Sequence, residues 1–309
     1  MIHVRQLSEI TLEQPSMVTI GVFDGVHRGH QELIRHLVAE AHSNNRKAVV
    51  LTFHPHPDVV LQGITERYYL TTPDQRATLL GEMGVDVVVT HAFDETVRDM
   101  RAEEFVDTLI SSLQMTCLRV GSDFALGYER EGDVDYLAQL GQEKGYELRP
   151  IELLKLNADE DRISSSMVRS VLREGNVTKA SDLLGRPYSV TGTVIQGDQR
   201  GRQIGFPTAN MQIWEQQLLP TTGVYAGWAT LGDERFMAVT NLGMRPTFDG
   251  QSLSLEPHLL DFDRNIYGQQ LTLTFEHRLR AEQKFDGLQA LIDQLQKDVA
   301  TGRNLLSIG

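Results

Sequence analysis

The feature that most constrains the fold is a regular alternation of short apolar runs with helical patterns over roughly the first 150 residues. The apolar runs, rich in β-branched residues, are expected to be strands at 17–22, 47–53, 85–90, 116–121 and 146–154. Helical patterns separate them at 29–43, 71–84, 101–113 and 133–145. Continuous apolar runs of this length suit a sheet that is covered on both faces. The alternation therefore predicts a doubly wound α/β domain with a mostly parallel sheet.

After Gly185 the pattern changes to extended segments separated by turn residues. Strand-like segments lie at 188–197, 223–231, 235–243, 254–262 and 269–279, and an amphipathic helical pattern covers 284–306. At the junction, Gly185 is expected to end a helix and Pro187 to prevent its continuation. The sequence thus predicts two domains, 1–184 and 185–309, the second being an all-β unit with a C-terminal helix.

The composition of the chain argues against nucleic-acid-binding, membrane-spanning and secreted disulfide-bonded proteins. The net charge of −13 excludes a broad basic surface for nucleic acid. No apolar run is long enough to span a bilayer, and the N-terminus lacks the apolar stretch of a signal peptide. The single cysteine, Cys117, cannot form an internal disulfide, in agreement with a reducing compartment. We expect a cytoplasmic protein with no membrane or nucleic-acid partner, and the oligomeric state is left open.

The first candidate site is the segment 21–30, GVFDGVHRGH, between the first expected strand and the first expected helix. In a doubly wound sheet, ligands bind where strand ends meet helix N-termini, because free backbone amides there favour phosphate. His27 and His30 share one helical face and can donate hydrogen bonds to phosphate oxygens. The pattern indicates that this segment takes part in nucleotidyl transfer. The alternative is that its glycines only form a turn and have no role in binding or catalysis.

The segment 52–57, TFHPHP, leaves a zinc site open as a second interpretation of the histidines. His54 and His56 alternate along an extended segment, so they are expected to face one side and to be able to join His27 and His30 around a metal. No thiolate or carboxylate stands at a characteristic spacing, which favours the nucleotidyl-transfer interpretation. Alternatively, the prolines build a rigid loop in which Phe53 stacks on a flat ligand.

Two further segments carry phosphate-binding chemistry. The serines of 162–169, RISSSMVR, indicate first a helix cap, but the flanking Arg162, Arg169 and Arg173 can also stabilise a departing pyrophosphate. The segment 200–210, RGRQIGFPTAN, is not a P-loop. Its Thr208 and Asn210 offer oxygen ligands suited to Mg²⁺, and a tight turn into a strand is the structural alternative.

Glu256 stands in the strand-like segment 254–262. A carboxylate that faces the interior of a barrel can accept a proton from a substrate hydroxyl, whereas most strand glutamates are only solvated. The residues alone leave both interpretations open.

Taken in order, these segments resemble the bacterial bifunctional riboflavin kinase/FMN adenylyltransferases, also called FAD synthetases. The resemblance covers nearly the whole chain. It also rests on VGSDFALG (120–127) with EGD (131–133), LLGRPY (183–188), GVYA (223–226), NLGMRPTF (241–248), LEPHLLDF (255–262) and RAEQKFD (280–286). It implies a Rossmann-like nucleotidyltransferase domain followed by a six-stranded antiparallel β-barrel with a C-terminal helix.

The resemblance also implies two reactions, each with ATP and Mg²⁺: the second domain phosphorylates riboflavin, and the first adenylylates FMN to FAD. His27 and His30 would bind the triphosphate and stabilise the attacked α-phosphorus. The implied ATP-binding set of the first domain is Gly21, Phe23, Asp24, Gly25, His27, His30, Ser164, Ser165 and Arg169. The implied flavin-binding set is Phe53, Pro55, Pro57 and Asp123.

For the second domain, the resemblance implies that Glu256 deprotonates the ribityl 5′-hydroxyl. The implied ATP-binding set is Arg202, Gly205, Phe206, Pro207, Thr208 and Asn210, of which Thr208 and Asn210 would also hold Mg²⁺. Three positions depart from the family pattern: His54 replaces a usual acidic residue, Val22 a common asparagine, and Pro257 a residue that can donate to a strand ladder. Two other functions remain open, a chain with only one of the two activities and a flavin-binding module without chemistry.

Overall fold

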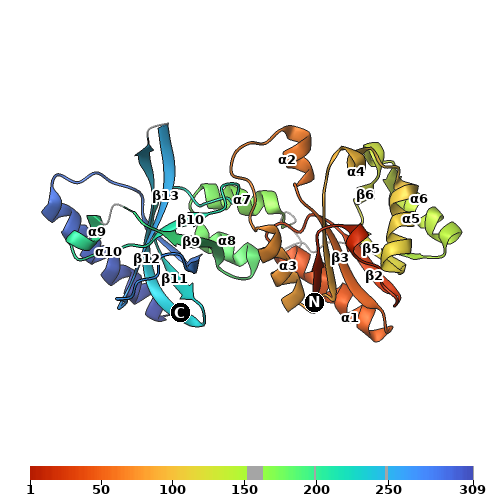
Figure 1. Ribbon diagram of the computed structural model, residues 1–309, viewed down its shortest axis with the longest axis horizontal. Helices are drawn as coiled ribbons and strands as arrows, with labels where there is room; N and C mark the ends of the chain where they lie inside the picture. Colours follow the sequence, from red (N-terminus) through yellow and green to blue (C-terminus); the bar gives the residue numbers. More distant parts are fainter. Residues whose placement is uncertain (152–162, 198–199, 248–249, 309) are drawn as a thin grey trace, which may run out of the picture. The chain divides into compact units, whose positions relative to one another are not determined.

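The computed structural model describes residues 1–151, 163–197, 200–247 and 250–308 and divides into two compact units, Met1–Ser165 and Ser166–Gly309 (Figure 1). The division falls in the first turn of α7 (Ser165–Arg173), so α8 (Val177–Leu184) also clusters with the C-terminal unit, whereas the sequence analysis grouped both with the first domain. Their packing explains the difference, because Thr221 N donates to Leu172 O and Thr178 Oγ1 to Glu276 O. Gly185 ends α8 with φ of 70°, as expected.

The N-terminal unit contains a six-stranded sheet in the order β1-β4-β3-β2-β5-β8, with every pairing parallel. Its strands are β1 (Ile2–Val4), β2 (Ser16–Ile20), β3 (Lys47–Phe53), β4 (Val87–His91), β5 (Met115–Gly121) and β8 (Glu147–Ile151). Its helices are α1 (Arg28–Ser43), α2 (Pro57–Gln62), α3 (Pro73–Glu82), α4 (Glu95–Asp99), α5 (Ala102–Leu113) and α6 (Val134–Lys144). A small hairpin adds β6 (Ala125–Leu126) and β7 (Gly132–Asp133). This is the predicted doubly wound α/β architecture.

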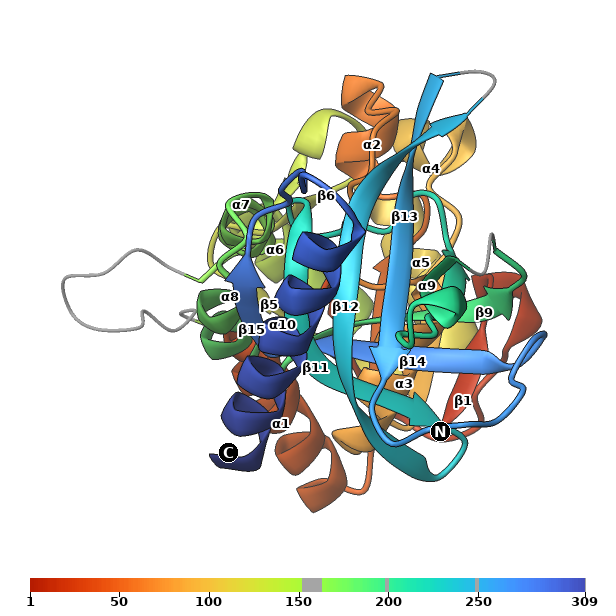
Figure 2. The ribbon, with the colours of Figure 1, turned by 90° about the vertical axis from the view of Figure 1, so that its left-hand side faces the viewer.

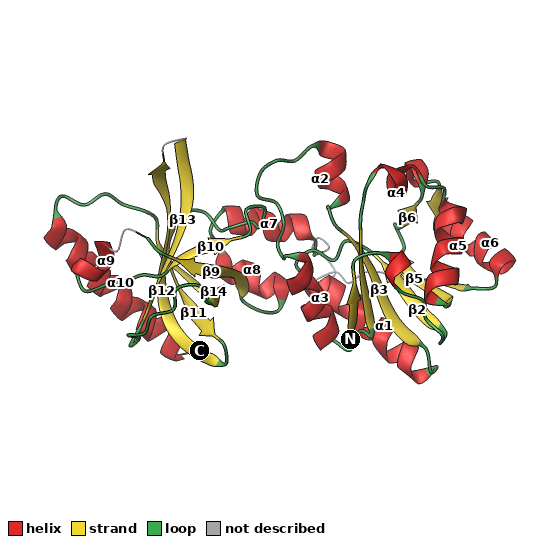
Figure 3. Ribbon diagram, viewed as in Figure 1, coloured by secondary structure: helices red, strands yellow, loops and turns green. Residues whose placement is uncertain are grey.

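Helices cover both faces of this sheet (Figure 3). Because strand side chains alternate between faces, Val18 and Ile20 of β2 pack in one core with α5 and α6, while Met17 packs in the other with α1 and α3. The chain runs from β2 outward through β3 and later returns to place β5 on the other side of β2. The carboxyl ends of β2 and β5 therefore flank a topological switch point, where ligands bind in such folds.

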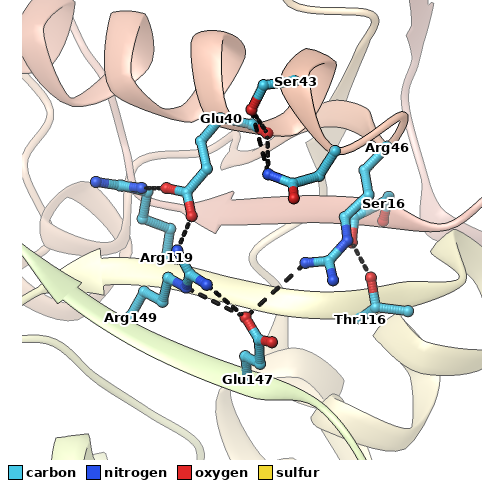
Figure 4. Close-up of polar contacts among 9 residues, drawn as sticks. Ser16, Glu40, Ser43, Arg46, Thr116, Arg119, Glu147 and Arg149 are labelled. Carbon is cyan, nitrogen blue, oxygen red and sulfur yellow. Dashed lines mark hydrogen bonds and ion pairs between the residues drawn. The ribbon is translucent and has the colours of Figure 1, made fainter.

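Glu40 ties the C-terminal half of α1 to the strands beneath it (Figure 4). Its carboxylate pairs with Arg119 of β5 and Arg149 of β8. Arg149 also bonds Glu147 at 2.9 Å, and Arg46 approaches the same carboxylate at 4.0 Å. This network fixes the helix whose other end carries His27 and His30.

The C-terminal unit is an antiparallel sheet in the order β10-β9-β14-β11-β12-β13, with β15 also paired to β11. Its elements are β9 (Tyr188–Ile195), α9 (Arg200–Gln203), β10 (Asn210–Ile213), β11 (Gly223–Leu231), β12 (Glu234–Thr247), β13 (Gly250–Leu259), β14 (Gln270–Phe275), β15 (His277–Arg280) and α10 (Leu288–Ile308). The two ends of the sheet approach each other where Ala209 N donates to Pro257 O at 2.9 Å. The sheet thus nearly closes into the predicted antiparallel barrel, but among the described residues it has seven strands where six were expected, because β15 pairs with β11 as a separate strand.

The C-terminal helix α10 lies beside β11 and β15 (Figure 2). Gly302 of α10 lets the helix approach closely, since a Cβ there would lie 2.9 Å from Val239 Cγ2. Asp298, buried on the same helix, accepts two hydrogen bonds from Arg280 Nε and one from Arg280 Nη2. Among the described residues, no helix is both long and apolar enough to cross a bilayer.

The expected elements agree with the observed ones except at a few places. The strand predicted at 269–279 is two strands, because Glu276 leaves the β14 ladder and donates its N–H to Ala226 O. The short edge strand β1, the hairpin of β6 and β7, and the helices α2, α4 and α9 were not expected. The end of the strand predicted at 146–154 lies outside the described residues beyond Ile151.

Candidate active sites

A cavity of about 680 Å³ opens in the N-terminal unit at the carboxyl ends of β2, β3 and β5. Most of its wall is apolar, including the rings of Phe23, Phe53, Phe93, Phe105, Phe124 and Tyr128. A smaller set of polar side chains reaches it, namely His30, Asp58, Arg98, Asp123, Glu129 and Arg130. A large apolar pocket with a few polar groups at a switch point is the usual form of a ligand site. Its aromatic wall suits a flat ring system.

The two histidines of the GVFDGVHRGH segment meet at the start of α1. His27 is the N-cap, and its Nδ1 accepts the backbone N–H of His30 at 3.3 Å. The two rings stack with their centroids 3.6 Å apart and their planes 19° apart. His27 is buried, whereas His30 lines the cavity and meets the ring of Phe23 edge-on. Because Nδ1 of His27 accepts a hydrogen bond, a neutral His27 carries its proton on Nε2 as a donor.

Asp24 is fully buried and shapes this loop from within. Its carboxylate accepts the backbone N–H groups of Leu70 and Thr71 at 3.0 Å, while Thr71 Oγ1 accepts the N–H of Gly25 at 3.2 Å. Ser165 Oγ donates to the Asp24 carbonyl at 2.8 Å, which brings the start of the RISSSMVR segment to the same loop. Asp24 and Ser165, both expected to bind ATP, therefore have direct partners within the protein.

The remaining residues of the expected ATP and flavin sets lie in different surroundings. Gly21 and Phe23 line the cavity, as do Phe53, Pro57 and Asp123 of the expected flavin set. Pro55 is exposed and is not part of the cavity wall. Ser164 is half-buried just before α7, and Arg169 on α7 is buried. Arg162 lies outside the described residues.

The histidines of TFHPHP do not form the metal cluster that was considered as an alternative. His56 is the N-cap of α2 and accepts Asp58 N–H, while His54 packs on the ring of Tyr69. Within the part of the chain that the structure describes, no three His, Cys, Asp or Glu side chains are grouped to hold a metal ion. Burial, followed by the charges of Arg76 and Arg5, lowers the pKa of His54 below its usual 6.5.

In the C-terminal unit, the RGRQIGFPTAN segment forms a compact loop before β10. Phe206 N donates to Gly201 O at 2.9 Å, and Gly205 adopts a left-handed φ of 84°. A Cβ at Gly201 would overlap Phe206 O, and one at Gly197 would overlap the carboxamide of Asn210. Both glycines are thus required for this close packing. Arg202 is exposed on α9.

This loop lies along β13 beside Glu256. Ala209, between Thr208 and Asn210, donates its N–H to Pro257 O, and His258 Nδ1 bonds Pro207 O at 2.7 Å. The ring of Phe206 also meets His258 edge-on at 5.6 Å. The structure therefore brings together the segments that carry Thr208, Asn210 and Glu256, as the sequence analysis expected of a single site.

Pro257 does not disturb the strand that carries Glu256. The β12–β13 register runs without a shift from Ala238 opposite Leu259 to Thr247 opposite Gly250, and Glu256 stands opposite Asn241. Leu255 and Pro257 are buried while Glu256 is half-buried. Because strand side chains alternate, Glu256 points to the face opposite these buried residues, where its cross-strand partner Asn241 is exposed. It does not face the apolar interior, which corrects the sequence-based interpretation of a carboxylate inside a barrel.

Several residues of the first cavity were not found from the sequence. Phe93, Arg98, Met100 and Phe105 line it from outside the quoted motifs, and Phe124 lies within VGSDFALG but was not assigned to the site. Arg76, whose guanidinium donates to the carbonyls of the cavity residues Val22 and Phe53, was not predicted either. Its position on the buried stripe of α3, next to Ala77 and four residues before Leu80, is the signal that marks it.

Comparison with known proteins agrees with this two-unit arrangement. A family model described as FAD synthetase matches residues 9–167, and one described as riboflavin kinase matches residues 184–306. The bifunctional riboflavin kinase/FMN adenylyltransferase of Pseudomonas fluorescens is 39% identical, with 98% of this chain and 97% of that protein covered. The chain belongs to this family.

Other relatives in the family are similarly close. The bifunctional riboflavin kinase/FMN adenylyltransferase of Listeria monocytogenes is 38% identical over 91% of this chain and 90% of its own length, and that of Escherichia coli K12 is 36% identical over 96% and 94%. A crystal structure of a protein described as a macrolide-efflux protein from Streptococcus pneumoniae has a TM-score of 0.88 at 30% identity and covers 98% of both chains. The predicted family and both predicted domain folds are confirmed.

Proposed function

We propose that this chain makes FMN and then FAD: riboflavin and ATP give FMN and ADP, and FMN with a second ATP gives FAD and pyrophosphate. The observation that carries the proposal is the match of the two family models to two segments of the chain, each containing one of the two candidate sites. We assign adenylyl transfer to residues 1–184 and riboflavin phosphorylation to residues 185–309. The enzyme is proposed to be cytoplasmic, with small-molecule partners and no nucleic-acid or membrane partner.

In adenylyl transfer, a phosphate oxygen of FMN attacks the α-phosphorus of ATP and pyrophosphate leaves. The aromatic cavity supports a role in seating the flavin ring, with Phe53, Pro57 and Asp123 in its wall. His27 and His30, stacked at the N-terminus of α1, are proposed to donate hydrogen bonds to the oxygens on which charge develops. The N-terminal amides of α1 add to the stabilisation of the phosphates.

We propose separate roles for the other residues expected at this site. Ser164, Ser165 and Arg169 are proposed to hold the triphosphate, a role suited to hydroxyl and guanidinium donors. Asp24 is proposed to act by fixing the loop, since its carboxylate accepts the amides of Leu70 and Thr71.

In the kinase reaction, Glu256 is proposed to take the proton of the ribityl 5′-hydroxyl as that oxygen attacks the γ-phosphorus and ADP leaves. The adjacent loop is proposed to hold the ATP phosphates through its backbone. Its members are Arg202, Gly205, Phe206, Pro207, Thr208 and Asn210. Support comes from the bond between Ala209 N and Pro257 O, which holds this loop next to Glu256.

Thr208 and Asn210 fit a magnesium ion. Hydroxyl and amide oxygens are the hard donors that Mg²⁺ accepts, and Gly197 leaves the room that the Asn210 carboxamide needs. Bound with ATP, Mg²⁺ neutralises phosphate charge and orients the transferred group.

A time course on the purified chain tests the proposal. Riboflavin, ATP and Mg²⁺ are incubated with the enzyme, and the flavins are separated chromatographically at intervals. We expect FMN to appear first and FAD to follow. A parallel sample receives FMN in place of riboflavin. FMN that accumulates without FAD would show a kinase alone, and FAD formed only from supplied FMN would show an adenylyltransferase alone. Riboflavin and FMN that are bound but unchanged would show a flavin-binding module.

A further inference from the structure

Arg76 is among the largest fully buried side chains of the described residues, with 1% of its surface exposed. It projects from α3, and its guanidinium binds two backbone carbonyls. Nη1 donates to Val22 O at 2.7 Å, and Nη2 donates to Phe53 O at 3.1 Å. Its Nε has no hydrogen-bond partner within the described part of the chain. Among the described residues, the hydrogen bonds of this buried guanidinium therefore both go to backbone carbonyls, those of Val22 and Phe53.

Those two carbonyls belong to the two loops that border the cavity. Val22 follows β2 and opens the loop that leads to His27, while Phe53 ends β3 and opens the loop that leads to Pro57. Both residues line the cavity. The ladder between β2 and β3 ends at Ile20 and Leu51, and beyond it the guanidinium bridges the two backbones. Beyond the ladder, Gly21 N still donates to Leu51 O and Thr52 Oγ1 to Val22 O, and Arg76 adds a link that joins both loops at once.

The chain just before α3 supports the same two loops. Leu70 and Thr71 bind the carboxylate of Asp24 through their amides, and Tyr69 Oη accepts the N–H of His56 at 2.9 Å. A capping box between Thr72 and Gln75 fixes the start of α3 itself. Arg76 therefore projects from a rigid base rather than from a flexible surface helix.

The loop after β2 needs such support because its backbone is strained. Phe23 and Val26 adopt left-handed φ angles of 52° and 42°, and a β-branched residue such as Val26 rarely does so. Strained conformations persist only where surrounding contacts determine them, and they occur often at functional sites. Thr52 Oγ1 also donates to Val22 O, at 2.7 Å. The Val22 carbonyl is consequently held from two sides.

The support does not depend on pH in the physiological range. Burial lowers the pKa of Arg76 from its usual value, and the nearby Asp24 and Tyr69 oppose that shift. A guanidinium nevertheless remains protonated in proteins. Its planar fork suits two separate carbonyls, whereas the ammonium of a lysine is a single point donor.

We propose that Arg76 is a positioning residue for adenylyl transfer, which fixes the loop that carries His27 and the loop that carries Phe53 in one relative arrangement. This inference rests on the proposed function of the N-terminal unit. It assigns to Arg76 the alignment of the flavin with the attacked phosphorus, without contact to either substrate. Loss of this alignment should lower kcat rather than raise KM, since misplacement of reacting groups by about 1 Å can lower a rate by roughly 100-fold.

The test uses Arg76→Met and Arg76→Lys in the full chain, with FAD formation from FMN and ATP as the assay. We expect Arg76→Met to lower kcat about 10- to 100-fold while both KM values change less than about threefold. Arg76→Lys keeps the positive charge, so its kcat should lie between those of Arg76→Met and the wild type. It also provides a second variant in case Arg76→Met does not fold. Riboflavin phosphorylation in the same samples should stay unchanged.

Leu80→Ala is the matched control, because Leu80 is fully buried on the same helix in the apolar core. This control should lower the melting temperature without a comparable loss in kcat. The inference is overturned if the Arg76 variants keep wild-type kcat, or if their losses merely follow the melting temperature as those of Leu80→Ala do. A wild-type chain that forms no FAD would instead contradict the proposed function itself.

Discussion

The imidazoles of His27 and His30 stack with their centroids 3.6 Å apart, and Nδ1 of His27 accepts the backbone N–H of His30. His27 therefore caps the N-terminus of α1, while His30 faces the cavity.

His30→Ala should lower FAD formation from FMN by about 100- to 1,000-fold, as the loss of a donor to developing charge does in other enzymes. His30 does not cap α1, so the helix should remain. The measurement is the initial rate of FAD formation at saturating substrates. FMN formation from riboflavin serves as the control, and equal loss of both activities would mean that the histidine serves the fold.

Glu256→Gln should lower riboflavin phosphorylation by about 100- to 10,000-fold, because the amide keeps the size but cannot take the proton. Conversion of supplied FMN to FAD should persist. Glu276→Gln is the matched control, since that carboxylate lies at the β14–β15 junction, 3.8 Å from Arg235. Near wild-type phosphorylation by Glu256→Gln would mean that another carboxylate is the base.

Both activities should require Mg²⁺. Incubation with EDTA should abolish FMN and FAD formation, and added Mg²⁺ should restore them, because both reactions need neutralised phosphate charge. Elemental analysis should find no stoichiometric zinc. Zinc that remains bound through purification and dialysis would contradict the account.

The N-terminal unit should lose stability as the pH falls below about 7. Burial is the largest cause that lowers the pKa values of His3, His54 and His91 from their usual 6.5. The unfolded chain then binds more protons than the folded chain, so stability is fully present above the unfolded pKa and falls as the pH drops toward the folded values. His91 Nδ1 also accepts Leu7 N–H at 3.4 Å, a bond that protonation removes.

Thermal unfolding measured between about pH 8 and pH 5 checks this dependence. His91→Asn should reduce the fall in melting temperature, whereas a change at the exposed His36 should not. A melting temperature of the N-terminal unit that is independent of pH across this range would show the prediction to be wrong.

Glu40→Ala should destabilise the N-terminal unit by about 2 kcal/mol, because Arg119 and Arg149 would face each other without their shared carboxylate. Denaturant unfolding followed by far-UV circular dichroism measures the effect. Glu32→Ala on the same helix is the control, as its partners Arg35 and His36 are exposed, and it should change stability by less than about 0.5 kcal/mol. Equal effects of the two changes would argue against the network.

Local patterns were enough to predict most of the fold. Apolar runs and helix caps, such as the Thr72 capping box, carry their signal in neighbouring residues. The edge strand β1 has only three residues, too few for a pattern, and no glycine or proline marks the break at Glu276. Elements that depend on distant pairing were therefore missed.

The candidate sites show the same difference between signals carried by neighbouring residues and contacts made between distant ones. The motifs carry His27, His30 and Glu256 within short segments, so the sequence indicates them. The role of Asp24 depends on amides 46 and 47 residues away, and that of Arg76 on carbonyls 54 and 23 residues away. Such partners cannot be deduced from spacing, because they meet only after the sheet has formed.

Complementation between two inactive variants tests the central claim, two separate activities in one chain, most directly. His30→Ala and Glu256→Gln are each incubated with riboflavin, ATP and Mg²⁺, then mixed in equal amounts. Alone, the first should accumulate FMN and the second should leave riboflavin unchanged, whereas the mixture should form FAD, because FMN made by one variant is adenylylated by the other. A mixture that forms no more FAD than the separate variants would contradict the account.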